Sequence, residues 1–148
     1  MRLNAAVALS VLGVTASVAI DKVATVQIQG QSATVKLEHV LSGHLTDLNG
    51  RYKLRVTEVT YDPDGYIGEH HHAGPGIRCV TVGELTYVQP DQTSIYHPGD
   101  CFYESGDLSH TAHNRTKGKT ILLNFELLPA SWKAGSAIPV PSPLPGSN

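Results

Sequence analysis

The sequence carries little charge. Only 16% of its 148 residues are charged, and the formal net charge is −2. Lysine and arginine are scattered along the chain, whereas a nucleic-acid-binding domain gathers them in a basic patch. The low charge density also argues against a disordered acidic or basic tail. We therefore expect no nucleic-acid partner.

Helical periodicity and several common catalytic motifs are also absent. No segment between residues 20 and 128 repeats apolar residues about every 3.6 positions over three turns. The chain has no P-loop, dinucleotide-binding fingerprint or Ser–His–Asp pattern. These absences argue against a helical bundle and against the enzyme classes that use those motifs.

Short segments that alternate apolar and polar residues fill this region instead. Turn signals such as Asn49-Gly50 and the run from Asp62 to Gly65 separate them. Many short strands at close spacing predict an all-β sandwich or barrel in a single domain. The expected strands cover 23–37 (broken at 30–32), 52–61, 77–82, 85–88, 93–96, 101–104, 110–114 and 121–128.

Cysteine is scarce, with only Cys79 and Cys101 in the chain. In an exported protein an even pair suggests a disulfide. Both residues lie in predicted strands, however, and two separate buried thiols fit the sequence about as well. The sequence leaves their pairing open.

The N-terminus is typical of a targeting segment. Arg2 is the only charge before Asp21, the run 5–19 is apolar or small, and Ser17 and Ala19 fit a signal-peptidase site. The run is shorter than the roughly 20 residues of a membrane span. We predict a signal peptide over 1–19 and an exported protein, periplasmic or secreted, with no membrane contact after processing. An N-terminal arm on a cytoplasmic protein is the alternative.

The rest of the chain divides into three predicted parts. Residues 20–36 form an arm or strand, 37–129 the barrel, and 130–148 a proline-rich tail. Alternating prolines favour extended structure without ladder hydrogen bonds. The tail is expected to be flexible or held on the surface, where Trp132 could anchor it.

Histidine is concentrated in one region, with six of the eight residues between 70 and 113. On a strand, alternate side chains share a face, so His70 and His72 point the same way, roughly 7 Å apart. Two imidazoles at that spacing can bind one ion. His71 faces the other side. From this triplet alone, a solvated histidine patch without metal is a slightly better interpretation.

Two motifs in order change this interpretation, because together they resemble the cupin family. The first is GYIGEHHHAGPGIRCVTVG (65–83), which contains the H-x-H pair, and the second is GDCFYESGDLSHTAHN (99–114). The resemblance implies a jelly-roll barrel. It also implies a metal site inside the barrel mouth, formed by His70, His72 and His110.

The chain departs from the family pattern at one metal ligand. Gly76 stands where cupins carry a glutamate. The site could be a plain three-histidine site with open positions, or Glu104 could supply an oxygen ligand, or metal binding could be lost. Glu69 is a poorer ligand candidate, since it neighbours His70 and faces the opposite side.

Three further residues are candidates for the substrate pocket. Arg78 could face inward and bind an anionic substrate or pair with Glu104, or it could face solvent. Asn114 shares a face with His110 and could support that residue or stabilise a turn. Tyr103 could line the pocket, although aromatic residues of small barrels are more often core.

The resemblance implies a metal-dependent enzyme acting on a small molecule. Fe, Mn or Ni would suit oxygenase or isomerase chemistry, and Zn would suit hydrolysis. The alternatives are a cupin that binds a small ligand or metal without turnover, and a metal-free structural barrel. Cupins commonly form dimers, so we expect a homodimer in which the arm 23–37 could pair across a two-fold axis.

Overall fold

The structure is a computed structural model that describes residues 24–141. The predicted signal peptide, residues 1–19, lies outside this range. The described part holds one short 3-10 helix, η1 (Thr46–Leu48), and no helix in it is long and apolar enough to cross a membrane. The strands are β1 (Ile28–Val40), β2 (Tyr52–His72), β3 (Gly76–Val82), β4 (Leu85–Gln89), β5 (Gln92–Tyr96), β6 (Cys101–Glu104), β7 (His110–His113), β8 (Thr120–Pro129) and β9 (Ala137–Pro139).

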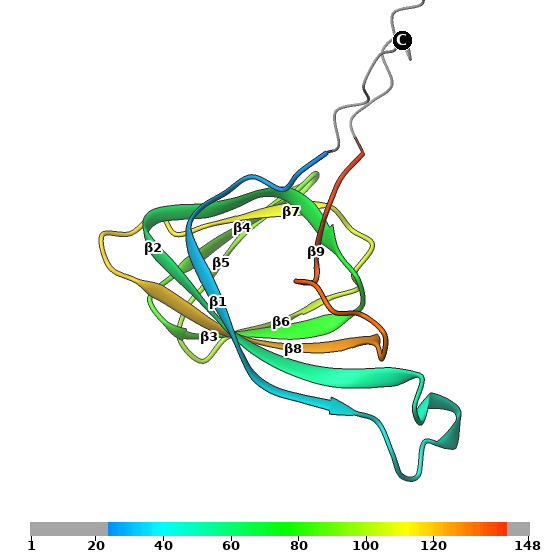
Figure 1. Cartoon of the computed structure of the whole chain (residues 1–148). Helices are drawn as coiled ribbons and strands as arrows, with labels where there is room; N and C mark the ends of the chain where they lie inside the picture. Colours follow the sequence, from blue (N-terminus) through cyan, green and yellow to red (C-terminus); the bar gives the residue numbers. More distant parts are fainter. Residues whose placement is uncertain (1–23, 142–148) are drawn as a thin grey trace, which may run out of the picture.

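All strand pairs are antiparallel, and the strands follow the order β5-β4-β7-β2-β8-β3-β6, with β1 and β9 also paired to β2. They curve around a common interior (Figure 1). The predicted all-β jelly-roll barrel is therefore confirmed.

Strand β2 joins the two halves of the barrel. Its first half pairs with β8 and its second half pairs with β7 and β9, whereas β1 pairs with parts of both halves. The sequence predicted that this strand ends at Asp62, but it bends there and continues. Gln29 is opposite Tyr66 and Gln31 is opposite Tyr61, so the intervening residues of β2 form a bulge opposite Gly30. The turn signal thus marks a bend within one strand.

Glycine is required at this bend by a close backbone approach. A Cβ atom on Gly65 would meet the carbonyl oxygens of Gly30 and Asp62. Asp64 adopts a positive φ of 60°, which Asp tolerates better than most residues. The bend turns the second half of β2, which carries the H-x-H pair, across the interior.

The register of the strands arranges the inner side chains in rows. Next to the histidines the row is charged, and the rows become apolar with distance from that end. The charged row is Glu38, Arg55, Glu126, Gly76 and Glu104; the second is Thr57, Asn124, Arg78 and Phe102; the third is Val59, Leu122 and Val80. The apolar row belongs to the main buried cluster, which also includes Ile67, Leu85 and Ala112.

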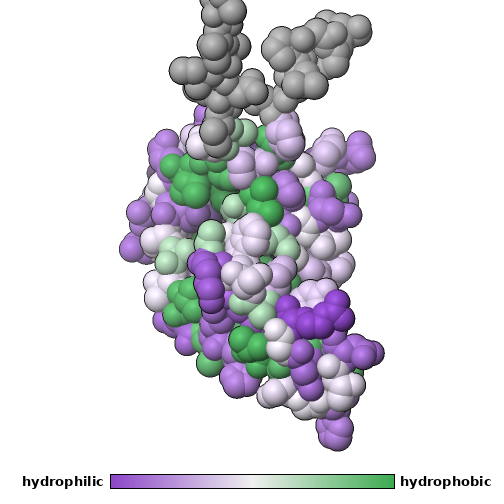
Figure 2. Space-filling view, turned by 45° about the vertical axis from the view of Figure 1, so that its right-hand side comes forward, coloured by the Kyte–Doolittle hydropathy of each residue, from purple (hydrophilic) through white to green (hydrophobic). Residues whose placement is uncertain are grey.

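The outer face of the same strands has the opposite character. Its middle row runs Leu37, Val56, Phe125, Ile77 and Tyr103, and all but Val56 are well exposed. In the view of Figure 2, apolar residues lie in separate patches among hydrophilic ones. The outer row is a contiguous set of mostly exposed apolar side chains.

The chain after β8 returns to the barrel. Strand β9 pairs with His70–His72 at the end of β2. The carbonyl oxygen of Trp132 accepts a hydrogen bond from the buried Nζ of Lys53, and that of Ala134 accepts one from Arg55 Nη1 at 2.8 Å. Residues 132–139 therefore lie against the barrel and adjoin the histidine pair.

The two cysteines, whose pairing the sequence left open, form a disulfide. Cys79 of β3 and Cys101 of β6 are directly opposite each other, with an S–S distance of 2.04 Å. Cys79 alternates with the inward-facing Arg78 and Val80, so the bond lies on the outer side of the sheet.

Candidate metal centre

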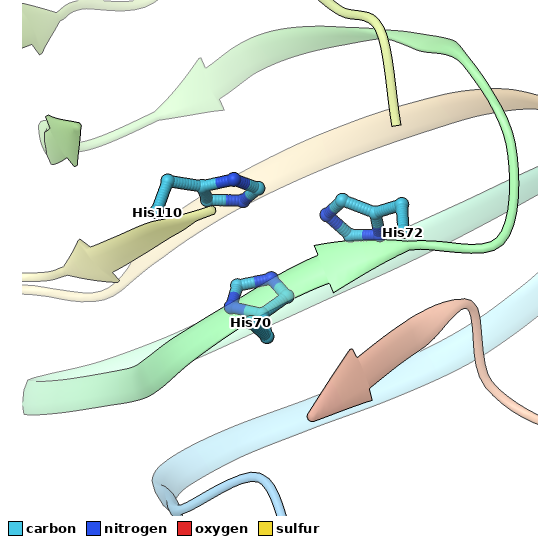
Figure 3. Close-up of side chains that lie close together, drawn as sticks. All are labelled: His70, His72 and His110. Atoms are coloured by element: carbon cyan, nitrogen blue, oxygen red, sulfur yellow. The ribbon is translucent and has the colours of Figure 1, made fainter. Parts of the chain in front are cut away.

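Three histidine rings converge inside the barrel. His70 and His72 come from the end of β2, and His110 begins β7, where it is directly paired with His70. One ring nitrogen from each lies within 4.8 Å of the others. Figure 3 shows the three rings turned toward one another. The alternation of the H-x-H pair and the pairing of β2 with β7 together produce this convergence.

Hydrogen bonds select the tautomer of two of these rings. His70 Nδ1 lies 2.8 Å from Gly68 O, and His110 Nδ1 lies 3.0 Å from Leu108 O. A carbonyl oxygen only accepts, so each Nδ1 carries the proton. The neutral rings then present their Nε2 lone pairs to the interior, as metal-binding histidines do.

The histidines are held in the neutral state. Burial lowers the pKa of His70 to about 4, with a further contribution from His110. Burial likewise lowers the pKa of His110 to about 4. Burial and the Arg78 cation lower the pKa of His72. Neutral imidazole is the form that binds a metal, so near neutral pH no proton competes for these nitrogens.

His72 is oriented by a residue that sequence reasoning missed. Its Nδ1 lies 3.1 Å from Ser136 Oγ, and Ser136 is also hydrogen-bonded to Glu126 Oε1. The serine hydroxyl donates to the carboxylate, so it accepts from His72 Nδ1–H. His72 then presents Nε2 inward, as the other two histidines do.

Glu104 lies against two of the histidines. Its Oε2 is 3.2 Å from His72 Nε2, and its Oε1 is 3.2 Å from His110 Nε2. Burial raises the pKa of this carboxyl group. The structure thus brings Glu104 to the place where the sequence proposed it as an oxygen ligand, although it arrives from β6 rather than from the first motif.

Arg78 fills the space that the missing glutamate side chain leaves. A Cβ atom on Gly76 would meet Arg78 Nη1. The guanidinium is 2% exposed, and its Nη2 lies 2.7 Å from Glu104 Oε2 and 3.1 Å from Glu126 Oε1. Of the two orientations left open by the sequence, the structure has the inward one, with Arg78 paired to two carboxylates.

The arrangement of donors and acceptors fits a divalent metal ion. The Nε2 lone pairs of His72 and His110 face carboxylate oxygens of Glu104, so acceptors face acceptors. Glu104 Oε2 is buried, and despite its ion-pair contact with Arg78 it receives no hydrogen bond. A cation among these atoms would make every one of these contacts favourable. Three imidazoles with an optional carboxylate match the preferences of Fe, Mn, Ni and Zn.

The histidines open onto a cavity of about 620 Å³ inside the barrel. Its wall includes the three histidines, Arg78 and Glu104, Val59 and Leu122 of the apolar row, and residues 133–137 of the returning chain. This volume lies within the range of about 300–1,000 Å³ typical of small-molecule sites.

Two predicted pocket residues do not line this cavity. Tyr103 is 69% exposed on the outer row, because it alternates with the inward-facing Glu104. Asn114 is buried and stabilises a turn: its Nδ2 donates to Asp62 O and Gly118 O, and its Oδ1 accepts from Thr116 N. Glu69 is exposed, as expected for the opposite face.

Sequence reasoning also missed Glu126. It lies in the charged inner row directly opposite Gly76 and Arg55, and it is 2% exposed. A single glutamate at an inward position of an apolar strand is a usable signal, since buried carboxylates are rarely tolerated without a partner. Ser136 gave no such signal.

The comparisons with known proteins agree with the fold and the motifs. The family described as a cupin domain matches residues 57–126. No curated protein matches the chain. Solved structures that resemble it include a cupin domain from Bordetella pertussis Tohama I, with a TM-score of 0.51 and 21% identity over 68% of this chain and 96% of that one.

Two further solved structures have a similar fold. The polyketide cyclase RemF from Streptomyces resistomycificus has a TM-score of 0.56 and 16% identity, over 77% of this chain and 75% of that one. KdgF from a Halomonas species has a TM-score of 0.51 and 16% identity, over 68% of this chain and 86% of that one. With the motif order, the barrel topology and the family match in agreement, residues 57–126 of this chain form a small cupin domain.

Proposed function

We propose that this protein is a metal-dependent enzyme of the oxygenase or isomerase type that acts on a small molecule. One divalent transition metal would be held by His70, His72 and His110. The observation that carries the proposal is the convergence of three neutral imidazoles at a cavity of ligand size. RemF, which has a similar fold, is described as a polyketide cyclase, so this barrel type supports enzymes.

Backbone and side-chain groups of the chain would orient the three metal-binding histidines. His70 and His110 present Nε2 because backbone carbonyls hold their Nδ1 protons. Ser136 and Glu126 orient His72 in the same way. A bound metal would polarise an oxygen-bearing substrate at its open positions or bring it together with dioxygen.

Glu104 has two roles available to it. It lies close enough to His72 and His110 to complete the ligand set, and its raised pKa also suits a group that exchanges a proton with the substrate. Arg78 limits the first role, since it already pairs with Glu104 Oε2. Of the two oxygens, Oε1 is the one that does not contact Arg78.

Elemental analysis of the untagged full chain tests the proposal. We expect close to one metal per chain, and its loss in His72→Ala. His71→Ala is the matched control, because it removes the neighbouring imidazole from the opposite face. The identity of the metal then separates oxygen or isomerase chemistry (Fe, Mn, Ni) from hydrolysis (Zn).

Three outcomes would contradict the proposal. Little metal in the wild-type chain after reconstitution with each ion would mean that Gly76 marks a lost site. Equal metal content in wild type and His72→Ala would place the ion elsewhere. Stoichiometric metal in a chain that turns over no substrate would indicate a ligand-binding cupin.

A further inference from the structure

The cavity beside the histidines has a largely apolar wall. Four residues of the wall belong to the main buried cluster: Val59, Leu85, Ala112 and Leu122. None of them is more than 6% exposed. Against an apolar wall, binding free energy is most favourable for a ligand that buries apolar surface of its own.

Aromatic side chains lie directly beside the metal centre. The ring of Tyr87 is 4.7 Å from that of His110 and 4.9 Å from that of Phe102, which stacks on Tyr96 at 4.1 Å. Tyr87 and Phe102 both line the cavity wall, so a ligand that reaches the histidines from the cavity contacts these two rings. A flat ring can make offset or edge contacts with them.

The polar side chains of the wall are largely engaged with each other. Gln31 donates to Tyr61 Oη at 2.7 Å, and Arg55 is bound by Glu38 and by Ala134 O. Arg78 and Ser136 bind Glu126. A sugar needs a hydrogen-bond partner for each of its buried hydroxyl groups, since an unpaired one is costly. The buried polar atoms that lack a hydrogen-bond partner are Arg78 Nη1, Glu104 Oε2 and Asn124 Oδ1, all in the two inner rows nearest the histidines. The hydroxyl groups of a polyol beyond that end would find few partners along the apolar row.

The charges of the wall also limit the ligand. Three carboxylates, Glu38, Glu104 and Glu126, match three cations, Arg55, Arg78 and Lys133. A divalent ion at the histidines would add two positive charges to this balance. A ligand whose one or two acidic oxygens sit at the metal end would offset them, while the rest of the ligand stays uncharged.

From these four features we infer that the substrate is a flat, mostly apolar aromatic molecule with adjacent phenol or enol oxygens at one edge, and not a sugar or sugar acid. This inference rests on the proposed function for the metal end and on the cavity wall for the rest. The oxygens would face the histidines, and the rings would lie along Tyr87 and Phe102.

Binding to the zinc-loaded full chain tests the inference with three probes. 2,3-Dihydroxynaphthalene and catechol share the same chelating oxygens but differ by one fused ring, and galacturonate supplies a carboxylate with hydroxyl groups. We expect calorimetry to show 2,3-dihydroxynaphthalene binding at least about tenfold more tightly than catechol, because the added ring buries apolar area. Galacturonate should bind at least about a hundredfold more weakly than 2,3-dihydroxynaphthalene.

A metal-free series keeps this inference separate from the proposed function. The metal-free chain is titrated with 2-naphthol, phenol and galacturonate, and the same ranking is expected, since the wall does not depend on the ion. If the chain takes up no metal but ranks these probes as expected, the proposed function fails and the ligand class stands. Tighter binding of galacturonate, or equal binding of all three probes, overturns the inference in either series.

A variant locates the binding in this cavity. Ala112→Leu places a larger side chain in the wall and should weaken 2-naphthol binding about tenfold or more, with metal content unchanged. Ile95→Ala is the control, because Ile95 is exposed on β5 and does not line the cavity. Should Ala112→Leu fold poorly, Leu122→Ala enlarges the same wall and should weaken the preference for 2-naphthol over phenol. Unchanged naphthol binding in a folded cavity variant contradicts the inference.

Discussion

Beside the histidines, the inner and outer faces of the strands β1, β2, β8, β3 and β6 differ from the usual pattern of a sheet. The inner face buries a row of charged residues, whereas the outer face exposes a row of apolar ones. A sheet built for stability alone would place them the other way round. The difference indicates that the inner row serves the metal centre and cavity.

The largest loss of stability is expected at the buried guanidinium of Arg78. Arg78→Leu removes the cation that lies between Glu104 and Glu126 and leaves two buried carboxylates without it. We expect a loss of about 3–5 kcal/mol in the free energy of unfolding, measured by urea denaturation. Arg115→Leu, at an exposed arginine, should stay within about 0.5 kcal/mol. A similar loss in both variants would mean that the buried pairing is of no special importance.

One pair of identical substitutions compares the two faces directly. Leu122 is 3% exposed on the inner face and Leu54 is 51% exposed on the outer face. Leu122→Ala should cost about 2–3 kcal/mol of unfolding free energy, toward the low end for a buried leucine because it already borders a cavity. Leu54→Ala should cost less than about 1 kcal/mol by thermal or urea unfolding. If Leu54→Ala costs as much, the outer face is covered by something that the single chain does not show.

The link between the returning chain and the metal centre can be tested through affinity. Ser136→Ala removes the acceptor that fixes His72 Nδ1, and we expect zinc affinity to fall about 10–100-fold in a competition titration. Ser136→Thr keeps the hydroxyl and should restore most of it. Ser131→Ala is the control on an exposed serine of the same segment. Failure of threonine to restore the affinity would indicate a packing role instead.

The smallest effect on folding is expected for a substitution in the outer row. Homodimer formation, predicted from the sequence, stays a prediction, and the outer row is a surface on which a second copy of the chain can be tested. Ile77→Lys should leave the unfolding free energy within about 0.5 kcal/mol but convert a dimer to a 15.8 kDa monomer in light scattering. Ile95→Lys, on exposed β5, should not. A monomeric wild-type chain would remove the dimer prediction altogether.

Much of the inner face could be predicted from the sequence, because it follows from alternation along strands. The H-x-H pair, the inward orientation of Arg78 and the position of Glu104 near the histidines all depend on which residues share a face. The same rule, applied from Glu104, would have excluded Tyr103 from the pocket. Alternation alone does not predict the role of Asn114, because its side chain donates hydrogen bonds to the carbonyl oxygens of Asp62 and Gly118.

Other features depend on contacts between segments that are distant in sequence. Ser136 contacts His72 only because β9 pairs with the end of β2. A proline-rich tail does not predict that pairing. The occupation of the Gly76 space by Arg78 requires the rotamer of a long side chain. The turn residues at Asp62 predict an end of the strand where β2 bends and continues, because such residues mark both bulges and strand ends.

The bond between Cys79 and Cys101 has a consequence for a chain that has been cut by a protease. The segment that it encloses contains β4 and β5, whose connecting turn at Pro90 and Asp91 is a surface loop of the kind that proteases attack. A single cut in that turn would leave both fragments joined through sulfur. The nicked protein would run as one piece on a non-reducing gel and as two after reduction, with the strand that carries Arg78 and the strand that carries Glu104 still tied side by side.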